Sequence, residues 1–330
     1  MRVPGVKRLR LAARWFRSRF TKGVLILGYH RITQTSQDPY SICVSPENFA
    51  QQLETLRKYA MPISLREVVE GLKCRELPSR AVALTFDDGY KDHLYEVKPL
   101  LEKYEVPATF FVTTGYFDTD FWWHELEDII ISTAKLPPRL SISIDGERFV
   151  WNNSSIQHST TSNSCRNKLL LSVHHRISLL PQQEQRRLLT ELRDWANADF
   201  SDTRSKALTR DELVQLAFGD LIDIGAHSVT HPFLSALPTA SQEAEIQESK
   251  ANLETLLGRP ISGFSYPNGA ISEHTLSIVQ EAGFSFACAS YNDVAWRGSN
   301  RFYLPRFWIG DWDRQTFSSW LQRWLCGPRE

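Results

Sequence analysis

The stretch RAVALTFDDGY, residues 80–90, constrains the fold of this chain more than any other. Five of the six residues from 81 to 86 are apolar, which predicts a buried central strand. Asp87, Asp88 and Gly89 follow at the carboxyl end of that strand, where ligands bind in parallel α/β folds. One aspartate can therefore bind a metal while its neighbour accepts a proton. For the Asp-Gly pair alone, the alternative is an ordinary turn.

A second strand signature, LIDIGAHSVTHP at residues 221–232, carries two histidines. His227 and His231 are four positions apart, a spacing that can place both imidazoles on one face of a turn or short helix, within reach of one cation. With one carboxylate they make a three-ligand metal site that leaves a position open for water. Such a pair alone can equally be hydrogen-bonded core or surface residues. The two motifs together, both at strand ends, favour a metal site.

At these motifs the sequence resembles the polysaccharide deacetylases, a family that includes chitin, peptidoglycan and nodulation-factor deacetylases. TFDDGY matches the first motif of that family, HSVTH matches its second, and SYPNG at residues 265–269 matches a relaxed form of its third. The resemblance extends over about residues 24–310, interrupted by one large insertion. It implies an α/β fold, a distorted (β/α) barrel, and a divalent metal cofactor, commonly zinc.

The resemblance also implies a reaction, the metal-dependent hydrolysis of an N-acetyl group on a saccharide to acetate and a free amino sugar. In this pattern the metal ligands are Asp88, His227 and His231, and Asp87 takes the proton of the attacking water. The residues expected at the saccharide are Tyr90, whose backbone N–H would stabilise the oxyanion, Tyr266 and Pro267. Two alternatives stay open: removal of another small acyl group such as formyl, and a degenerate member that binds carbohydrate without hydrolysis.

The sequence departs from the family pattern at two positions. The third motif usually carries an arginine that pairs with the catalytic aspartate, but here Ser265 precedes Tyr266. The L-x-H triplet that supplies the usual general acid is missing after residue 276. We expect His30 to serve as the acid, because deacetylases of exopolysaccharide loci have a similar Tyr-His pair at this point, and Arg306 to replace the arginine.

Charge and cysteine usage limit the partners and the compartment. The first 22 residues carry eight basic groups and no acidic one, which leaves 30 basic against 38 acidic groups in the rest of the chain. That acidic remainder argues against a nucleic-acid partner, which would need a basic surface. Five scattered cysteines without a C-x-x-C pair favour a reducing compartment, and no signal peptide or membrane span is evident. We expect a cytoplasmic protein of exopolysaccharide biosynthesis.

The chain is expected to divide at residue 22. Residues 1–22 predict a basic amphipathic helix, which either contacts an anionic membrane, where a lipid-linked saccharide could be the substrate, or packs on the barrel. Residues 23–330 predict the barrel, with strands over residues 24–29, 81–86, 107–113, 221–226, 261–266, 284–289 and 303–309. An α+β insertion over about residues 114–202 breaks the alternation. It contains an Asp145-Gly146 hairpin and two helices, and it could form a lid over the site.

Overall fold

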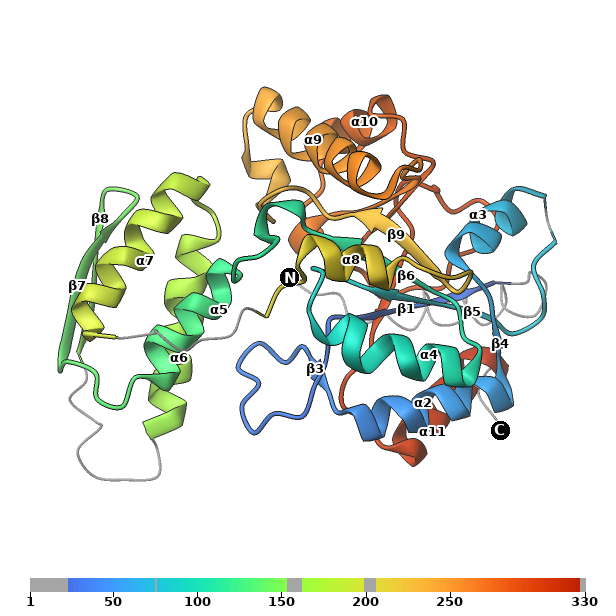
Figure 1. Cartoon of the computed structure of the whole chain (residues 1–330), viewed down its shortest axis with the longest axis horizontal. Coiled ribbons are helices and arrows are strands. Elements are labelled where there is room, and N and C mark those ends of the chain that lie inside the picture. The colour runs from blue at the N-terminus through green and yellow to red at the C-terminus, as the bar shows by residue number, and fades with distance from the viewer. Residues whose placement is uncertain (1–22, 75, 153–161, 199–205, 327–330) are drawn as a thin grey trace, which may run out of the picture.

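A parallel sheet of short buried strands forms the centre of the computed structural model, which describes residues 23–74, 76–152, 162–198 and 206–326 (Figure 1). The expected helix at residues 1–22 lies outside the described residues. The strand order in the sheet is β11-β10-β9-β6-β5-β1-β12, and β4 pairs with β5. The strand bounds are β1 Leu25–Tyr29, β4 Met61–Pro62, β5 Ala81–Phe86, β6 Ala108–Val112, β9 Ile222–Ala226, β10 Gly263–Ser265, β11 Phe286–Cys288 and β12 Phe307–Trp308.

The segment before β12 joins the two edges of this sheet. Leu304 makes a parallel bridge with Cys288 of β11, and Phe307 then pairs with Leu27 of β1. One short stretch of chain thus contacts both edge strands, which curls the sheet into a distorted (β/α) barrel. The predicted fold class is confirmed.

Alternating side chains along the strands build two hydrophobic layers. Ala81 and Ala83 of β5 belong to a small cluster with Ile26 and Phe111, whereas Val82 and Leu84 belong to the large cluster beneath the outer helices. Successive side chains of a strand point to opposite faces. Thr85 and Asp87 therefore continue the row that starts at Ala81, on the face of the small cluster.

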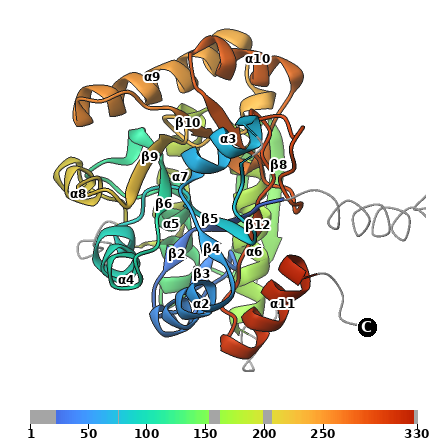
Figure 2. The ribbon, with the colours of Figure 1, turned by 90° about the vertical axis from the view of Figure 1, so that its right-hand side faces the viewer.

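Helices surround the sheet on its outer side (Figure 2). Their bounds are α2 Pro46–Tyr59, α3 Leu65–Cys74, α4 Lys98–Tyr104, α8 Arg210–Leu216, α9 Thr239–Leu257, α10 Glu273–Glu281 and α11 Arg314–Cys326. Side-chain caps explain where two of these helices start. The Ser45 side chain accepts a hydrogen bond from Asn48 N–H before α2, and Thr209 and Glu212 form a reciprocal capping box before α8. No helix among the described residues combines the length and the apolar composition needed to cross a bilayer.

The expected insertion forms a lobe beside the barrel, on the left in Figure 1. It contains α5 Trp122–Glu127, the hairpin β7 Arg139–Ile144 and β8 Glu147–Asn152, and the helices α6 Ser162–Ile177 and α7 Gln182–Ala196. Asp145 and Gly146 both have positive φ, as a tight hairpin turn requires. The lobe has a hydrophobic cluster of its own, which includes Leu126, Leu170 and Leu188. The proposed boundaries of the insertion stay a prediction.

Three regions differ from the expected elements. A π-helical turn, His93–Val97, precedes α4, and Tyr90 before it pairs with Ala207 in a β-bridge; the sequence pattern predicted neither feature. The strand pair β2 Arg31–Ile32 and β3 Cys43–Val44 was not predicted, since two-residue strands carry no alternation. Helix α11 was also missed, although Phe317, Trp320 and Trp324 have helical spacing.

Candidate active site

Asp87 and Asp88 leave the end of β5 in different directions because the backbone turns sharply between them. Asp87 N–H still donates to Tyr29 O at 3.0 Å, as a continuation of the strand. Asp88 has φ +80° and Gly89 has φ +93°. A Cβ at Gly89 would lie 2.8 Å from Val112, so both the torsion and the close approach require glycine. A left-handed aspartate is costly, and such torsions concentrate at functional sites.

The loop after β9 holds His227 and His231 in a turn and not in a helix. The carboxylate of Glu245, from α9, accepts hydrogen bonds from the backbone N–H groups of Val229 and Thr230, both at 2.8 Å, and from the Thr230 hydroxyl. His231 itself has φ +58°. The Glu245 carboxylate therefore fixes the conformation of the loop that carries both histidines.

The three expected metal ligands converge on one point. Asp88 Oδ1 lies 3.4 Å from His227 Nε2 and 3.4 Å from His231 Nε2, and the three ligand atoms lie within 4.8 Å of one another. Asp88 Oδ1 is buried and has no hydrogen-bond partner. His227 Nδ1–H donates to Ser265 O at 2.8 Å, which leaves the Nε2 lone pair facing Asp88. An orphaned carboxylate oxygen between two imidazole nitrogens fits a divalent cation.

Charge and burial act against each other at these imidazoles. Burial acts to lower the pKa of both histidines. For His227 the negative charges of Asp87 and Asp88 outweigh burial and raise the pKa. For His231 burial prevails and lowers the pKa to about 4.

Asp87 makes a two-point ion pair with Arg306. Arg306 Nη1 lies 2.7 Å from Asp87 Oδ1, and Nη2 lies 2.8 Å from Oδ2. Burial alone would raise the pKa of the Asp87 carboxyl, but the Arg306 guanidinium outweighs burial and lowers it. Asp87 is therefore ionised. Its Oδ2 also lies 3.7 Å from His227 Nε2, so the carboxylate stands beside the candidate metal site.

The Arg306 side chain is fully buried, and each of its three guanidinium nitrogens donates hydrogen bonds to neighbouring groups. Its Nε–H donates to Ala289 O at 3.1 Å, its Nη1–H to Thr85 Oγ1 at 3.2 Å, and its Nη2–H to Ser265 Oγ at 2.8 Å. The guanidinium also lies 4.6 Å from the ring of Trp308. Ser265 stands where the family pattern has its arginine, and its hydroxyl donates to Asp87 Oδ2 at 3.1 Å. The structure thus brings an arginine to Asp87 from the segment just before β12, and its catalytic role stays a prediction.

His30 lies at the end of β1 beside the same carboxylates. Its ring stacks on Trp308 at a centroid distance of 4.4 Å. Burial lowers its pKa, against the charges of Asp88 and Asp87, so the imidazole is neutral near pH 7. Its proposed role as general acid stays a prediction.

The expected saccharide-contacting residues are more buried than the sequence suggested. The Tyr266 ring is fully buried, and its hydroxyl donates to Phe302 O at 3.0 Å. Pro267 is also buried. Tyr90 contacts Ala207 through a bridge whose hydrogen bonds are made by Gly89 O and Lys91 N–H, so the Tyr90 N–H is not used in that bridge. Contacts of these three residues with a saccharide stay predictions.

A polar network that the sequence did not reveal holds Tyr90 from the insertion side. Trp123 Nε1–H donates to Tyr90 Oη at 3.0 Å, and His124 Nε2 lies 3.0 Å from the same oxygen. His124 Nδ1 lies 2.8 Å from Glu127, so Nδ1 carries the proton and Nε2 accepts from the tyrosine hydroxyl. Trp123 also contacts the ring of His231 at a centroid distance of 4.9 Å. No local sequence pattern around residues 122–124 indicates these contacts.

Comparison with known proteins identifies relatives across most of the chain. The family model described as Polysaccharide deacetylase matches residues 75–169 and 193–287. A poly-beta-1,6-N-acetyl-D-glucosamine N-deacetylase of Staphylococcus aureus strain MSSA476 is 21% identical over 313 residues, which cover 91% of this chain and 82% of the relative. The protein of the same name from Escherichia coli K12 is 28% identical over 99 residues, which cover 29% of this chain and 15% of the relative.

Two solved structures share the fold. IcaB from Ammonifex degensii superposes with a TM-score of 0.60 at 20% identity, over 91% of this chain and 97% of that one. The Streptococcus pyogenes deacetylase PplD, solved with acetate, superposes with a TM-score of 0.59 at 20% identity, over 91% and 98% of the two chains.

Proposed function

Since the chain belongs to the polysaccharide deacetylase family, we propose that Asp88, His227 and His231 hold the divalent metal of a saccharide N-deacetylase. The activity is the metal-dependent hydrolysis of an N-acetyl group on a saccharide, which yields acetate and a free amino sugar. The single observation that carries the site assignment is the buried Asp88 Oδ1, which lacks a hydrogen-bond partner and lies 3.4 Å from both imidazole nitrogens.

The proposed substrate is poly-β-1,6-linked N-acetylglucosamine or an oligomer of it. The support is the Staphylococcus aureus relative of that name, whose similarity extends over 91% of this chain. The proposed metal is zinc, because two imidazole nitrogens and one carboxylate oxygen suit that ion. When bound, the metal polarises the amide carbonyl and makes water a better nucleophile.

Different protein groups carry out the separate proton transfers of the reaction. Asp87 is ionised, lies beside the ligand cluster, and takes a proton from water while the water oxygen bonds to the amide carbon. The Tyr90 N–H donates to the carbonyl oxygen as negative charge develops there. The carbon–nitrogen bond then breaks, and the departing nitrogen takes a proton. The lowered pKa of His30 leaves its imidazole neutral at the start of the reaction. His30 therefore acts as the acid only after it has received the proton that Asp87 took from water. The alternative is that Asp87 itself gives this proton to the departing nitrogen.

The test is acetate release from N-acetylated glycans, with and without a chelator. We expect the β-1,6-linked oligomer to release acetate, the chelator to abolish release, and added Zn²⁺ to restore it. Formate release from an N-formylated sugar, without acetate release, would assign the formyl alternative. Binding of the oligomer without release of any acyl group would overturn the enzyme assignment in favour of a carbohydrate-binding protein.

We further propose a cytoplasmic location with contact to the membrane surface through residues 1–22. The location is supported by four free thiols among the described residues, those of Cys43, Cys74, Cys165 and Cys288. The membrane contact is supported by the eight basic groups of the first 22 residues. Each basic group near an anionic leaflet contributes about 1 kcal/mol. Cell fractionation tests the location, and vesicle sedimentation of the full chain against a chain lacking residues 1–20 tests the contact. Equal sedimentation would overturn it.

A further inference from the structure

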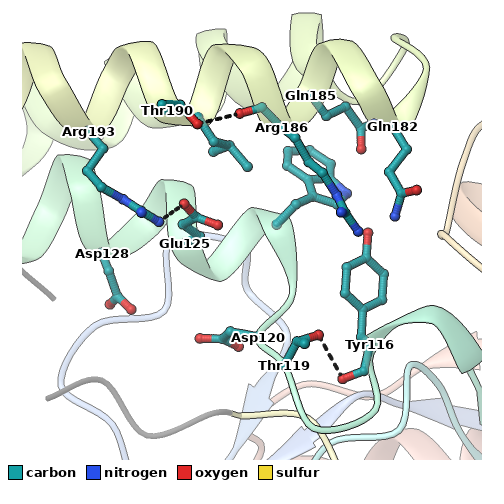
Figure 3. Close-up of a pocket in the computed structure, with 12 residues that line it drawn as sticks. Tyr116, Thr119, Asp120, Glu125, Asp128, Gln182, Gln185, Arg186, Thr190 and Arg193 are labelled. Atoms are coloured by element: carbon teal, nitrogen blue, oxygen red, sulfur yellow. Dashed lines mark hydrogen bonds and ion pairs between the residues drawn. The ribbon is translucent and has the colours of Figure 1, made fainter. Parts of the chain in front are cut away.

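A cavity of about 440 Å³ lies between α7 and the segment that leads into α5 (Figure 3). This volume is within the range of about 300–1,000 Å³ that small-molecule sites occupy. Gln182, Gln185 and Arg186 extend from α7 on one side, and Tyr116 lies opposite them (Figure 3). The cavity belongs to the insertion and contains none of the proposed metal ligands.

The acidic groups of this cavity are already neutralised. Glu125 makes an ion pair with Arg193. Lys206 lies 3.1 Å from Asp128 and 3.7 Å from Asp120. The carboxylates therefore do not make the cavity a cation site.

The opposite end of the cavity offers hydrogen-bonding groups. Among the described residues, no ion pair of Arg186 is found, and its guanidinium extends toward Tyr116 (Figure 3). Gln185 is buried and donates its amide N–H groups to Ile177 O and Leu180 O, which leaves its side-chain oxygen as an acceptor. Donors and acceptors beside aromatic walls suit an uncharged, polyhydroxylated ring.

The cavity shares a wall with the candidate metal site. Tyr116 lines the cavity, and its hydroxyl donates to Thr230 O, one residue before the ligand His231. The Tyr116 ring lies 5.7 Å from Trp123, and the Trp123 ring lies 4.9 Å from His231. Two aromatic rings thus separate the cavity from the metal ligand.

We propose that this cavity is a subsite for a second, still acetylated sugar unit of the same saccharide chain whose neighbouring part occupies the metal site. Arg186 donates to the acetamido oxygen or to hydroxyls of that unit, and the neutral amides of Gln182 and Gln185 complete the contacts. A free amino sugar, which is cationic, is disfavoured beside the unpaired guanidinium. The assignment rests on the proposed deacetylase function, because it needs a saccharide at the metal site.

The experiment compares a dimer and a hexamer of N-acetylglucosamine as substrates for the full chain and for Arg186→Ala. Loss of a charged hydrogen-bond donor is expected to raise KM for the hexamer about tenfold, with kcat unchanged and the dimer unaffected. Gln182→Ala is expected to act in the same direction with a smaller effect. Arg187→Ala is the matched control, because Arg187 is the next residue on α7, does not line the cavity, and pairs with Glu184 and Glu191.

Equal losses for dimer and hexamer, or an equal loss in Arg187→Ala, would overturn the subsite. Calorimetric titration of the hexamer in the presence of chelator decides the question separately from catalysis. The subsite is supported if the hexamer binds more tightly than the dimer and this difference disappears in Arg186→Ala. This conclusion holds even if no acetate is released, in which case only the proposed function fails. Hexamer binding no tighter than dimer binding overturns it.

Discussion

Arg306 and Asp87 are 219 positions apart in sequence, yet two hydrogen bonds of 2.7 and 2.8 Å join the guanidinium to both carboxylate oxygens. The Arg306 side chain is fully buried and Asp87 is only 2% exposed, so the two opposite charges balance each other away from bulk water. The pair links the end of β5 to the segment that closes the barrel. The ion pair therefore both stabilises the closed barrel and fixes the position of Asp87, the proposed catalytic base.

Removal of the guanidinium should destabilise the protein strongly. Arg306→Met leaves Asp87 as an unpaired buried charge, which typically costs about 3–5 kcal/mol of the free energy of unfolding. Urea denaturation measures this loss. Arg301→Met, at an exposed arginine, is the control and should change the free energy by less than about 0.5 kcal/mol. Similar values for the two variants would contradict a structural role for the pair.

The Tyr90 hydroxyl should matter because it serves two buried partners at once. Tyr90→Phe leaves the Trp123 indole N–H and the His124 Nε2 without a partner, at an expected cost of about 1–3 kcal/mol in unfolding free energy. Tyr95→Phe also removes a hydrogen-bonded hydroxyl, but Tyr95 is 57% exposed, so its loss should cost far less. Thermal denaturation of both variants compares the two, and equal melting temperatures would show that the network contributes nothing.

The two histidines after β9 should decide metal content. His227→Ala and His231→Ala each remove one nitrogen of the three-ligand cluster, so elemental analysis of the purified variants should find sub-stoichiometric metal. His274→Ala is the control, because His274 is exposed on α10 and bonds only Thr239 among the described contacts. Full metal content in the two site variants would place the metal elsewhere.

His174 should make the insertion sensitive to acid. Burial, aided by the positive charges of neighbouring histidines, lowers the pKa of His174 to about 4, and its ring stacks on Trp122 at 4.9 Å. Between about pH 6.5 and 4 the unfolded chain binds the proton and the folded chain does not, so the free energy of unfolding falls as pH falls. The slope from this group is up to about 1.4 kcal/mol per pH unit.

His174→Phe keeps a ring against Trp122 and removes the titration. The free energy of unfolding of this variant should therefore fall less steeply with acidification than that of the wild type. His175→Phe, at the exposed neighbouring position on α6, controls for the added phenyl ring. Identical slopes for wild type and His174→Phe would show that His174 does not titrate with a lowered pKa.

Local patterns predicted the strands, the hairpin of the insertion and the DDG and HSVTH motifs because each of these depends on near neighbours in sequence. The Asp145-Gly146 turn is an example in which the residue type itself sets the backbone geometry. The convergence of Asp88 with His227 could also be expected, since parallel strands end at one edge of the sheet.

Contacts that join distant segments had no such signal. Arg306 was expected near the site because it lies on a predicted barrel strand. The role of Ser265 was not predicted: its hydroxyl donates a hydrogen bond to Asp87 and accepts one from Arg306. The position of Trp123 over His231 depends on how the insertion packs against the barrel. The burial of the Tyr266 ring depends on its bond to Phe302, 36 residues later.

The most direct test of the account compares acetate release and metal content in Asp87→Asn and Asp88→Asn. Asp87→Asn keeps all three proposed ligands and removes the base, so release should fall by about 10²–10⁴-fold while metal content stays at the wild-type level. Asp88→Asn removes a charged ligand, so metal and activity should be lost together. Wild-type release by Asp87→Asn would contradict the mechanism, and metal lost from Asp87→Asn but kept in Asp88→Asn would exchange the roles of the two residues.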